Sequence, residues 1–319
     1  MTTLVTGATG FLGRHLVESL ATRGEALRIL ARPGADVERL LVLGADVIEG
    51  DVTDEASLRG AATGCDRIYH LAGVVSHRQR DRRLLEAVNV RGTGNVLAAA
   101  DPGARVVHVS SIAAVGPVAS PHQRADEQHV FPAEANDLPY SGTKRAGEKL
   151  AFEAAARGVD VVVASPGFLL GPGDVHRVST WPVSAYAAGR VRFTTSGGLS
   201  FVDARDVARG LIALAEHGTS GERTILAGEP GNLTWKAFFE RVSQVSGSRR
   251  RTVDVPRPVA RATARLLPWL VAPDEVRAAA HWWFVNAAKA ERELGFTTRP
   301  IDETIADTLE DHTRAASRS

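Results

Sequence analysis

The stretch that decides the fold runs from residue 3 to residue 13 and reads TLVTGATGFLG. A short apolar strand ends at Val5, and three glycines spaced as GxxGxxG follow it directly. A strand, a glycine turn and a helix in this order are the setting that a dinucleotide-binding fingerprint requires. Apolar side chains then recur at helical spacing, on a face made of Leu12, Leu16, Val17 and Leu20. The chain therefore predicts a dinucleotide site at its N-terminus.

Each glycine of this loop has an expected part. Gly7 permits the tight turn, Gly10 lets the backbone approach a pyrophosphate, and Gly13 lets the helix pack close to the strand. The unpaired N–H groups and the positive dipole end of the helix favour phosphate binding. The other loop positions expected to contact the cofactor are Thr9, Phe11 and Leu12.

Outward from the loop, short apolar strands alternate with helical segments. The alternation predicts an α/β fold of the Rossmann type, a doubly wound parallel sheet with right-handed crossovers and helices on both faces. The expected strands are Leu4–Val5, Ala26–Ala31, Asp46–Glu49, Arg67–Leu71, Arg105–Val109, Asp160–Ala164 and Arg223–Leu226.

The regular alternation breaks after Pro166. We expect residues 1–166 and 201–228 to form the NADP-binding domain. Residues 167–200 and 229–312 are expected to form a smaller, mainly helical substrate lobe over the C-terminal edge of the sheet, where ligands of open α/β sheets bind. Residues 313–319 are expected to be a frayed tail. The aromatic residues expected mostly to form the core of the lobe are Trp235, Phe238, Phe239, Trp269, Trp282, Trp283 and Phe284.

Composition argues against several classes of protein. The 319 residues are 44% hydrophobic and carry a net charge of +1, so no overall field favours nucleic acid or a membrane. No apolar run reaches the ~18 residues of a membrane helix. The glycine loop begins so early that we expect no signal peptide. The single cysteine, Cys65, fits a reducing compartment, and a cytoplasmic location is expected.

The residue after the second strand bears on the choice of cofactor. An acidic residue there would accept a hydrogen bond from the ribose 2′-OH of NAD, whereas an arginine pairs with the 2′-phosphate of NADP. The chain has Arg32 there and no Asp or Glu. We therefore expect NADP in preference to NAD, with a merely solvated arginine as the alternative. No metal ion is expected.

Further cofactor contacts are expected where later strands end. After the third strand, Asp51 can accept from an adenine amino group and Val52 can cover the ring, while Thr53 or Asp54 would cap the next helix. After the fourth strand, small residues leave space for a ribose, and His70 is more typical of a core histidine than of a catalyst. The expected contacts at these and later strand ends include Leu71, Ala72, Gly73, Ser110, Pro166, Gly167, Phe168 and Leu169.

Tyr140 and Lys144 lie one helical turn apart, so their side chains share a face. A free tyrosine has a pKa of about 10 and needs a nearby cation before it can act as an acid or base at neutral pH. Lys144 can supply that charge and can also hold the nicotinamide ribose. Ser111, at the end of the fifth strand, can hydrogen-bond the substrate oxygen. The three residues together indicate hydride transfer to or from a carbonyl.

These motifs together resemble the extended short-chain dehydrogenase/reductase family over almost the whole chain. The matching segments are 7–13, 50–54, 70–73, 89–95, 109–111, Tyr140 with Lys144, 166–174, 201–208 and 293–296. The resemblance implies that Ser111, Tyr140 and Lys144 are the catalytic triad and that Asn89 braces the fold.

Two branches of that family compete for this chain. Nucleotide-sugar epimerases and dehydratases usually use NAD, and typically place an arginine just before the 201–203 strand. This chain has Leu199 near that point, although Arg190 or Arg192 could reach in. The other branch resembles dihydroflavonol reductases and related carbonyl reductases, which usually use NADP. An apolar run after Gly167 favours this branch and an apolar or aromatic carbonyl or alcohol as substrate.

A third alternative is an NADP-binding sensor without catalysis, for which the Tyr/Lys pair is atypical. The expected partner is a small-molecule substrate, with no nucleic acid and no membrane. A monomer and a homodimer both stay open.

Overall fold

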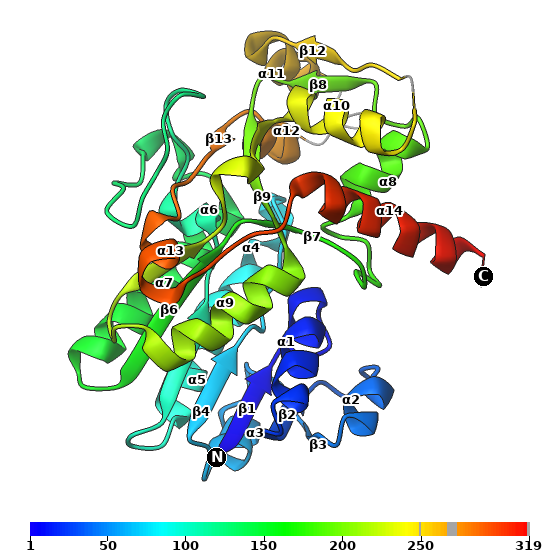
Figure 1. The fold of residues 1–319 in the computed structure, drawn as a ribbon. Helices are drawn as coiled ribbons and strands as arrows, with labels where there is room; N and C mark the ends of the chain where they lie inside the picture. The colour runs from blue at the N-terminus through cyan, green and yellow to red at the C-terminus, as the bar shows by residue number, and fades with distance from the viewer. Residues whose placement is uncertain (249, 267–272, 318–319) are drawn as a thin grey trace.

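The computed structural model describes residues 1–248, 250–266 and 273–317, so Trp269 and the last two residues lie outside the described part (Figure 1). Its main sheet has seven strands in the order β10-β6-β5-β4-β1-β2-β3, and every neighbouring pair is parallel. The strands are β1 (Thr2–Thr6), β2 (Ala26–Ala31), β3 (Asp46–Glu49), β4 (Arg67–His70), β5 (Arg105–Val109), β6 (Asp160–Pro166) and β10 (Arg223–Leu226). This order confirms the doubly wound Rossmann-type fold.

The strand boundaries follow the sequence closely. β2, β3, β5 and β10 have the expected bounds, whereas β1 is longer and β4 ends one residue early. β6 continues two residues past Ala164 because Ser165 and Pro166 still pair with β10, at Ile225 and Leu226. The end of β6 is therefore set by its pairing with β10 and not by the end of the apolar run.

Helices cover both faces of the sheet (Figure 1). One face packs on α1 and α9 and the other on α3, α5 and α7. In α1, the expected apolar face of Leu12, Leu16, Val17 and Leu20 is buried. The helices of this part are α1 (Phe11–Thr22), α2 (Glu38–Val42), α3 (Glu55–Ala62), α4 (Arg82–Leu85), α5 (Thr93–Ala99), α6 (Ile112–Val115), α7 (Pro139–Ala156) and α9 (Ala204–His217). A π-helical segment, Glu86–Gly92, joins α4 to α5.

The rest of the chain builds a lobe beyond the carboxyl ends of the strands (Figure 1). Besides its helices it contains two small sheets that the sequence did not predict. β9 (Gly198–Asp203) pairs with β7 (Phe168–Leu170), β11 (Asn232–Thr234) and β13 (Trp282–Trp283), and β8 (Phe193–Thr195) pairs with β12 (Val253–Val255). β9 therefore runs across the boundary expected at residue 201. The helices of the lobe are α8 (Trp181–Ala187), α10 (Trp235–Val245), α11 (Arg257–Leu266), α12 (Pro273–Ala279) and α14 (Ile301–Ala316). α13 (Ala288–Leu294) lies in the segment expected to belong to the lobe, but it packs on α9 and β10 of the main domain.

Most aromatic residues of this part pack inside it, as expected. Phe201 and Phe238 are stacked with ring centroids 4.1 Å apart, and Phe239 stacks on Tyr186 at 5.1 Å. All four are buried. They come from β9, α10 and α8, so the aromatic cluster is what joins these distant segments.

α14 ends at Ala316, so it includes the first residues of the 313–319 tail that the sequence predicted to be frayed. α14 buries Ile301, Ile305 and Thr308, and His312 in its fourth turn hydrogen-bonds Thr180 Oγ1 at 2.9 Å. The buried face contains small polar residues as well as apolar ones, so the sequence did not signal it. Within the described residues, no helix combines the length and apolar character needed to span a bilayer.

Candidate active site

The glycine loop lies where β1 and β4 meet, at the point where the strand order reverses. Gly7 has φ +75°, and a Cβ there would lie 2.6 Å from the Ala72 nitrogen. A Cβ on Gly13 would lie 2.2 Å from the Gly7 oxygen. The loop is therefore pressed against the end of β4 on one side and the start of α1 on the other, and only glycine fits at either position.

The start of α1 leaves backbone donors free. Gly10 is the N-cap residue, it offers no side-chain cap, and the first turn holds no acidic residue. The first N–H groups of a helix have no partner within the helix. This cradle of free donors and glycine backbone fits the pyrophosphate of a dinucleotide. Among the neighbouring loop residues, the Thr9 oxygen accepts from Arg14 Nε at 3.2 Å, and Phe11 packs edge-on against His15.

Arg32 is exposed immediately after β2. Among the described residues, no carboxylate pairs with its guanidinium. The nearby acidic residue Asp36 is paired instead with Arg14, at 3.1 Å. At the adenosine end of the expected site, the Arg32 guanidinium is therefore available to bind a phosphate.

In the turn after β3, adjacent residues make different contacts. Asp54 caps α3 by accepting from the Ala56 N–H at 3.0 Å, which is one of the two caps expected. Asp51 Oδ1 accepts from both the backbone and the hydroxyl of Thr53. Val52 is buried and packs against Gly92, so little of it faces outward.

The expected proton donor, Tyr140, lies in the first turn of α7. Burial raises the pKa of Tyr140 to about 12, and a hydrogen bond with the Ser111 hydroxyl acts in the opposite direction. Ser111 Oγ also accepts from the Ala113 N–H at 3.1 Å, which caps α6. The N-terminal ends of α6 and α7 thus bring Ser111 and Tyr140 together.

Lys144 lies buried one turn further along α7. Its Nζ donates to the Val109 carbonyl at the end of β5, at 2.8 Å. Burial lowers the pKa of Lys144 to about 8, and the carboxylate of Glu148 opposes that shift. Glu148 is itself buried and paired with Arg223. The ammonium is therefore fixed in position, with its charge poorly solvated.

Asn89 and His70 form hydrogen bonds in the buried layer next to the three expected catalytic residues. The Asn89 amide bonds the backbone N–H and carbonyl of Val74 at 2.8 and 3.0 Å, and its nitrogen also donates to Thr143 Oγ1 at 3.2 Å. His70 hydrogen-bonds the hydroxyls of Thr6 and Thr93 at 2.8 and 3.1 Å. His70 is thus a satisfied core histidine, as expected, and Asn89 ties the loop after β4 to α7.

The remaining expected contacts surround the same edge of the sheet. A Cβ on Gly73 would lie 3.4 Å from Lys144 Nζ, and the half-buried Leu71 and Ala72 precede it. The Ser110 hydroxyl is buried and has no partner among the described residues. The segment after β6 holds Pro166 at the strand end, Gly167 bonded to the Leu226 carbonyl at 3.2 Å, and the half-buried Phe168 and Leu169 in β7.

His77 is a site residue that the sequence reasoning missed. Its ring meets Tyr140 edge-on, with centroids 6.0 Å apart. Its Nδ1 is buried and has no partner in the described part of the chain. Burial lowers the pKa of His77, while Glu275 and Asp274 of α12 act the other way. No motif marks this position, because His77 lies in an irregular loop after β4.

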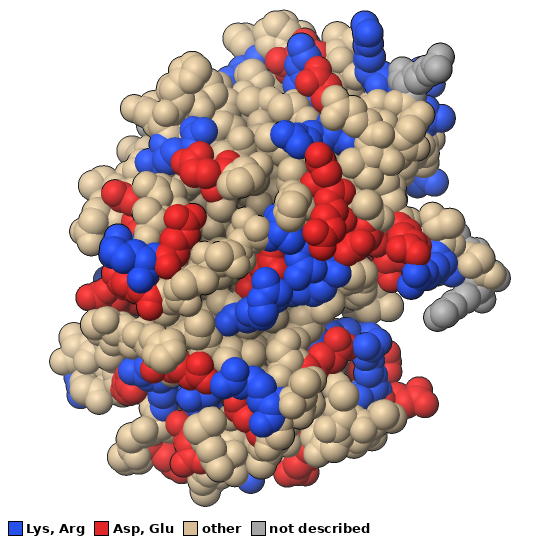
Figure 2. Space-filling view, in the orientation of Figure 1, with Lys and Arg blue, Asp and Glu red and all other residues tan. Residues whose placement is uncertain are grey.

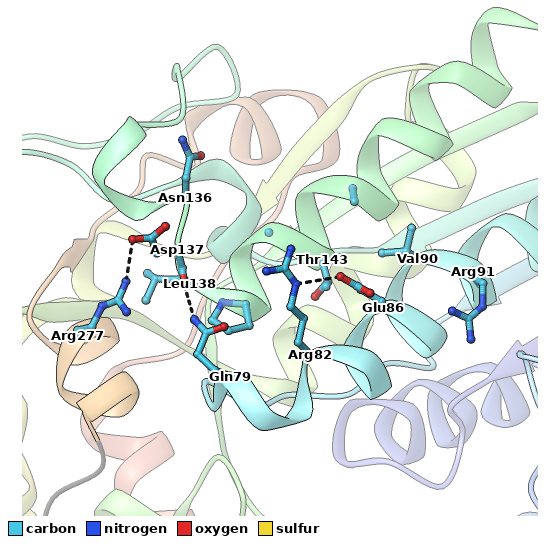
Figure 3. Close-up of a pocket in the computed structure, with 13 residues that line it drawn as sticks. Gln79, Arg82, Glu86, Val90, Arg91, Asn136, Asp137, Leu138, Thr143 and Arg277 are labelled. Carbon is cyan, nitrogen blue, oxygen red and sulfur yellow. Dashed lines mark hydrogen bonds and ion pairs between the residues drawn. The ribbon is translucent and has the colours of Figure 1, made fainter. Parts of the chain in front are cut away.

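A polar cavity of about 830 Å³ lies beside the site rather than in it (Figure 3). Its walls include Gly142 and Thr143 of α7 but none of Ser111, Tyr140 and Lys144. Two ion pairs line it, between Arg82 and Glu86 at 3.0 Å and between Arg277 and Asp137 at 3.5 Å. Because none of the three expected catalytic residues lines it, we assign it no part in the chemistry.

Comparisons with known proteins identify the family and the fold. Residues 3–228 match the NAD dependent epimerase/dehydratase family. The chain is 32% identical to a 4-hydroxy-2-methyl-3-oxo-4-farnesyl-3,4-dihydroquinoline-1-oxide ketoreductase from Stigmatella aurantiaca, covering 97% of this chain and 96% of that protein. It is 35% identical to sterol demethylase protein B from Methylococcus capsulatus, over 80% of this chain and 78% of the other. The solved structure of gox2253 superposes with a TM-score of 0.86 at 29% identity, covering 98% of both chains.

Proposed function

The chain belongs to the NAD-dependent epimerase/dehydratase family and is an NAD(P)-dependent oxidoreductase, and we propose that it interconverts an apolar ketone or aldehyde and the matching alcohol with NADP as cofactor. The observation that carries this proposal is the grouping of the half-buried Ser111 and Tyr140 with the buried Lys144 at the carboxyl edge of the sheet. An acid, a cation and a hydroxyl around one point suit the reduction of a carbonyl oxygen.

Each residue of this grouping has a distinct part in the proposed mechanism. When bound, a nicotinamide supplies or accepts the hydride at the carbonyl carbon. Ser111 holds the substrate oxygen, and Tyr140 gives that oxygen its proton. Since burial raises the pKa of Tyr140 to about 12, the phenol keeps its proton at neutral pH and is ready to donate it. Lys144 stabilises the phenolate that remains, and the Val109 carbonyl fixes its position.

The choice of NADP rests on Arg32. Its guanidinium is exposed at the end of β2, and no carboxylate among the described residues neutralises it. A 2′-phosphate would supply that missing anion through charge-assisted hydrogen bonds. The ribose 2′-OH of NAD is neutral, so it can accept a hydrogen bond from the guanidinium but cannot balance its charge.

The proposed substrate class follows from the apolar residues beside the site. Phe168 and Leu169 of β7 are half-buried and follow the strand end at Pro166. Two relatives carry names with a sterol and a farnesyl group, both of which are large and apolar. Removing apolar surface from water contributes about 25 cal/mol per Å², so such a substrate needs few polar contacts.

We include His77 among the substrate contacts, because its unpartnered Nδ1 adjoins the proposed proton donor. His77→Phe keeps a ring against Tyr140 and removes the nitrogen. KM should rise more than kcat falls if His77 binds substrate. An equal fall in kcat and in kcat/KM would place its effect on the transition state alone.

The test is a panel of carbonyl compounds assayed with NADPH and with NADH. Steroid-like, long-chain and aromatic ketones are compared with UDP- and dTDP-sugars by nicotinamide absorbance and by thermal stabilisation. Turnover of apolar ketones with a preference for NADPH supports the proposal. Reaction with nucleotide sugars alone would make the chain an epimerase or dehydratase. Cofactor binding without any turnover would favour the sensor alternative.

A further inference from the structure

The outer end of the lobe exposes large apolar side chains. Phe193 and Val253 stand opposite each other on the paired strands β8 and β12, and are 68% and 60% exposed. Val259 and Leu266 of α11 follow in the chain, and are 52% and 73% exposed. Folded monomers rarely gather such side chains in water without a use for them. Figure 1 places β8, β12 and α11 together at the end of the molecule farthest from the N-terminus.

The orientation of α11 is the reverse of an ordinary surface helix. Its inward face is made of small residues, among which Ala264 is 2% exposed. Val259, Ala262 and Leu266, at spacings of three and four, face outward. A helix that merely covered the lobe would bury its larger apolar residues and show polar ones to water. The apolar stripe of α11 therefore faces away from the protein's own core.

The same end carries a local excess of positive charge. Residues 249–266 contain six arginines and one acidic residue, Asp254, although the whole chain has a net charge of only +1. Arg251 and Arg265 are exposed and pair with no carboxylate among the described residues. Arg190 and Arg192, which precede β8, are also exposed, and no carboxylate in the described part of the chain pairs with them. In Figure 2, blue side chains project from this upper end of the molecule.

This surface is held firmly in place. The Val253 N–H donates to the Arg192 carbonyl at 2.9 Å, which joins the two outer strands. The Arg257 guanidinium lies over the Trp282 ring, 3.8 Å from its centroid, and so anchors the start of α11 to β13. Arg250 donates to the Ala187 carbonyl at 3.1 Å. The apolar and basic side chains are thus presented together on fixed backbone.

We propose that this outer surface, formed by Phe193, Val253, Val259, Leu266, Arg251 and Arg265, docks the enzyme on a bilayer that contains anionic phospholipid. Amphipathic helices with arginine beside an apolar stripe lie in the plane of a membrane interface, with the apolar side chains among the acyl chains. Arginines near such a surface are attracted by the negative headgroups. A nucleic acid would pair with the arginines but would leave the four apolar side chains in water.

Docking of this kind goes beyond the proposed carbonyl chemistry and does not depend on it. A protein can bind the bilayer whatever its substrate is, and can reduce an apolar ketone without binding the bilayer. Vesicle binding is measured without cofactor or substrate, so failure of one proposal leaves the other intact.

The test is co-flotation with vesicles of phosphatidylcholine alone and of phosphatidylcholine mixed with phosphatidylglycerol. The full chain should float with the mixed vesicles at low salt, and less at high salt. Arg251→Gln with Arg265→Gln should weaken binding roughly thirtyfold, from about 1 kcal/mol for each arginine. Phe193→Ser with Leu266→Ser should weaken binding at every salt concentration, because the apolar contribution is not screened.

Matched controls lie at the other end of the molecule. Leu41→Ser with Val42→Ser removes apolar side chains that are 54% and 82% exposed on α2. Arg59→Gln with Arg157→Gln removes two exposed arginines that have no carboxylate partner among the described residues. Both controls should float like the starting protein, and every variant should keep its melting temperature, since only exposed groups change.

Several outcomes would overturn the proposal. One is a starting protein that does not float with mixed vesicles, and another is an equal loss of binding in controls and variants. If Phe193→Ser with Leu266→Ser changes only the oligomeric state, the surface is a contact between copies of this chain. If the arginine pair affects binding to DNA but not to vesicles, the charge serves nucleic acid.

Discussion

The carboxyl edge of the main sheet and the outer lobe are built on opposite principles. At the sheet edge, polar groups are buried and fixed: Lys144 bonds a strand-end carbonyl, and Asn89 bonds both polar groups of one peptide. In the outer lobe, apolar side chains such as Phe193 and Leu266 are left in water. Each region carries groups in an environment that folding alone would not favour. Both regions are therefore candidates for functional sites.

The two regions also differ in how their parts come together. The sheet edge combines strand ends, such as that of β5 before Ser111, with the first turns of α7, which carry Tyr140 and Lys144. The lobe is made of segments separated by tens of residues, joined through the ring cluster of Phe201, Phe238 and Tyr186. Changes at the sheet edge should therefore affect chemistry and cofactor binding, whereas changes in the lobe core should affect stability.

The largest effect is expected from Tyr140→Phe. Loss of the proton donor should lower turnover by roughly 10²–10⁴-fold while cofactor affinity stays near its starting value. Tyr69→Phe is the matched control, because the Tyr69 hydroxyl is buried without a partner in the described structure. Steady-state kinetics and cofactor titration measure both variants. Near-normal turnover by Tyr140→Phe would remove the mechanism proposed here.

Phe238→Ala should act on the lobe instead. The ring is fully buried and stacked on Phe201, so its loss should lower the free energy of unfolding by about 3–5 kcal/mol. Chemical denaturation measures the change, and Val253→Ala, at an exposed site, should be close to neutral. If Phe238→Ala weakened cofactor binding and left stability unchanged, the division between the two regions would be wrong.

Gly7→Ala tests whether crowding, rather than backbone strain alone, shapes the glycine loop. The left-handed backbone contributes about 1–2 kcal/mol and the clash with the end of β4 about 1–3 kcal/mol more. Gly24→Ala is the control, since Gly24 has φ +74° but nothing within 4 Å of an added Cβ. The free energy of unfolding and the cofactor affinity should both fall further for Gly7→Ala. Equal losses would mean that the close contact with Ala72 is unimportant.

Arg32→Ala should weaken NADP binding about ten- to a hundredfold, from a charge-assisted contact of about 1.5–3 kcal/mol. NAD binding should change little, because NAD carries no 2′-phosphate. Arg59→Ala, at another exposed arginine, should affect neither cofactor. Isothermal titration with both cofactors decides the matter, and tighter NAD binding by the starting protein would contradict the assignment.

The smallest expected effect is the uptake of a fraction of a proton when the cofactor binds. Because burial lowers the pKa of Lys144 to about 8, part of the free protein lacks that proton above this pH. An anionic cofactor nearby favours the charged form, so binding at about pH 9 should take up protons, and binding at about pH 6 should not. Titration calorimetry in buffers of different ionisation enthalpy measures the uptake. Lys144→Met should abolish it, and uptake that persists in this variant would point to another group.

The sequence predicted the strands of the main sheet well, because the patterns that mark a strand are short-range. Four of the seven strands have the bounds that their apolar runs predicted, and α1 buries the face that its spacing predicted. The end of the chain was harder to interpret from its sequence, because the buried face of α14 mixes Ile305 with Thr308 and His312. Small polar residues make a buried helix face look like an exposed one until its partners are known.

What the sequence by itself determined is the glycine turn at Gly7, the seven-stranded parallel fold, and a tyrosine and lysine on one helix face. These depend on backbone conformation and on side-chain periods of two and 3.6 residues, which are readable within a few positions. What only the tertiary structure decided is that His77 meets Tyr140, that Glu148, itself paired with Arg223, acts on Lys144, and that the net charge of +1 conceals a basic, apolar end of the lobe. The physical reason is that burial and local charge depend on neighbours brought from far along the chain, and composition averages over them.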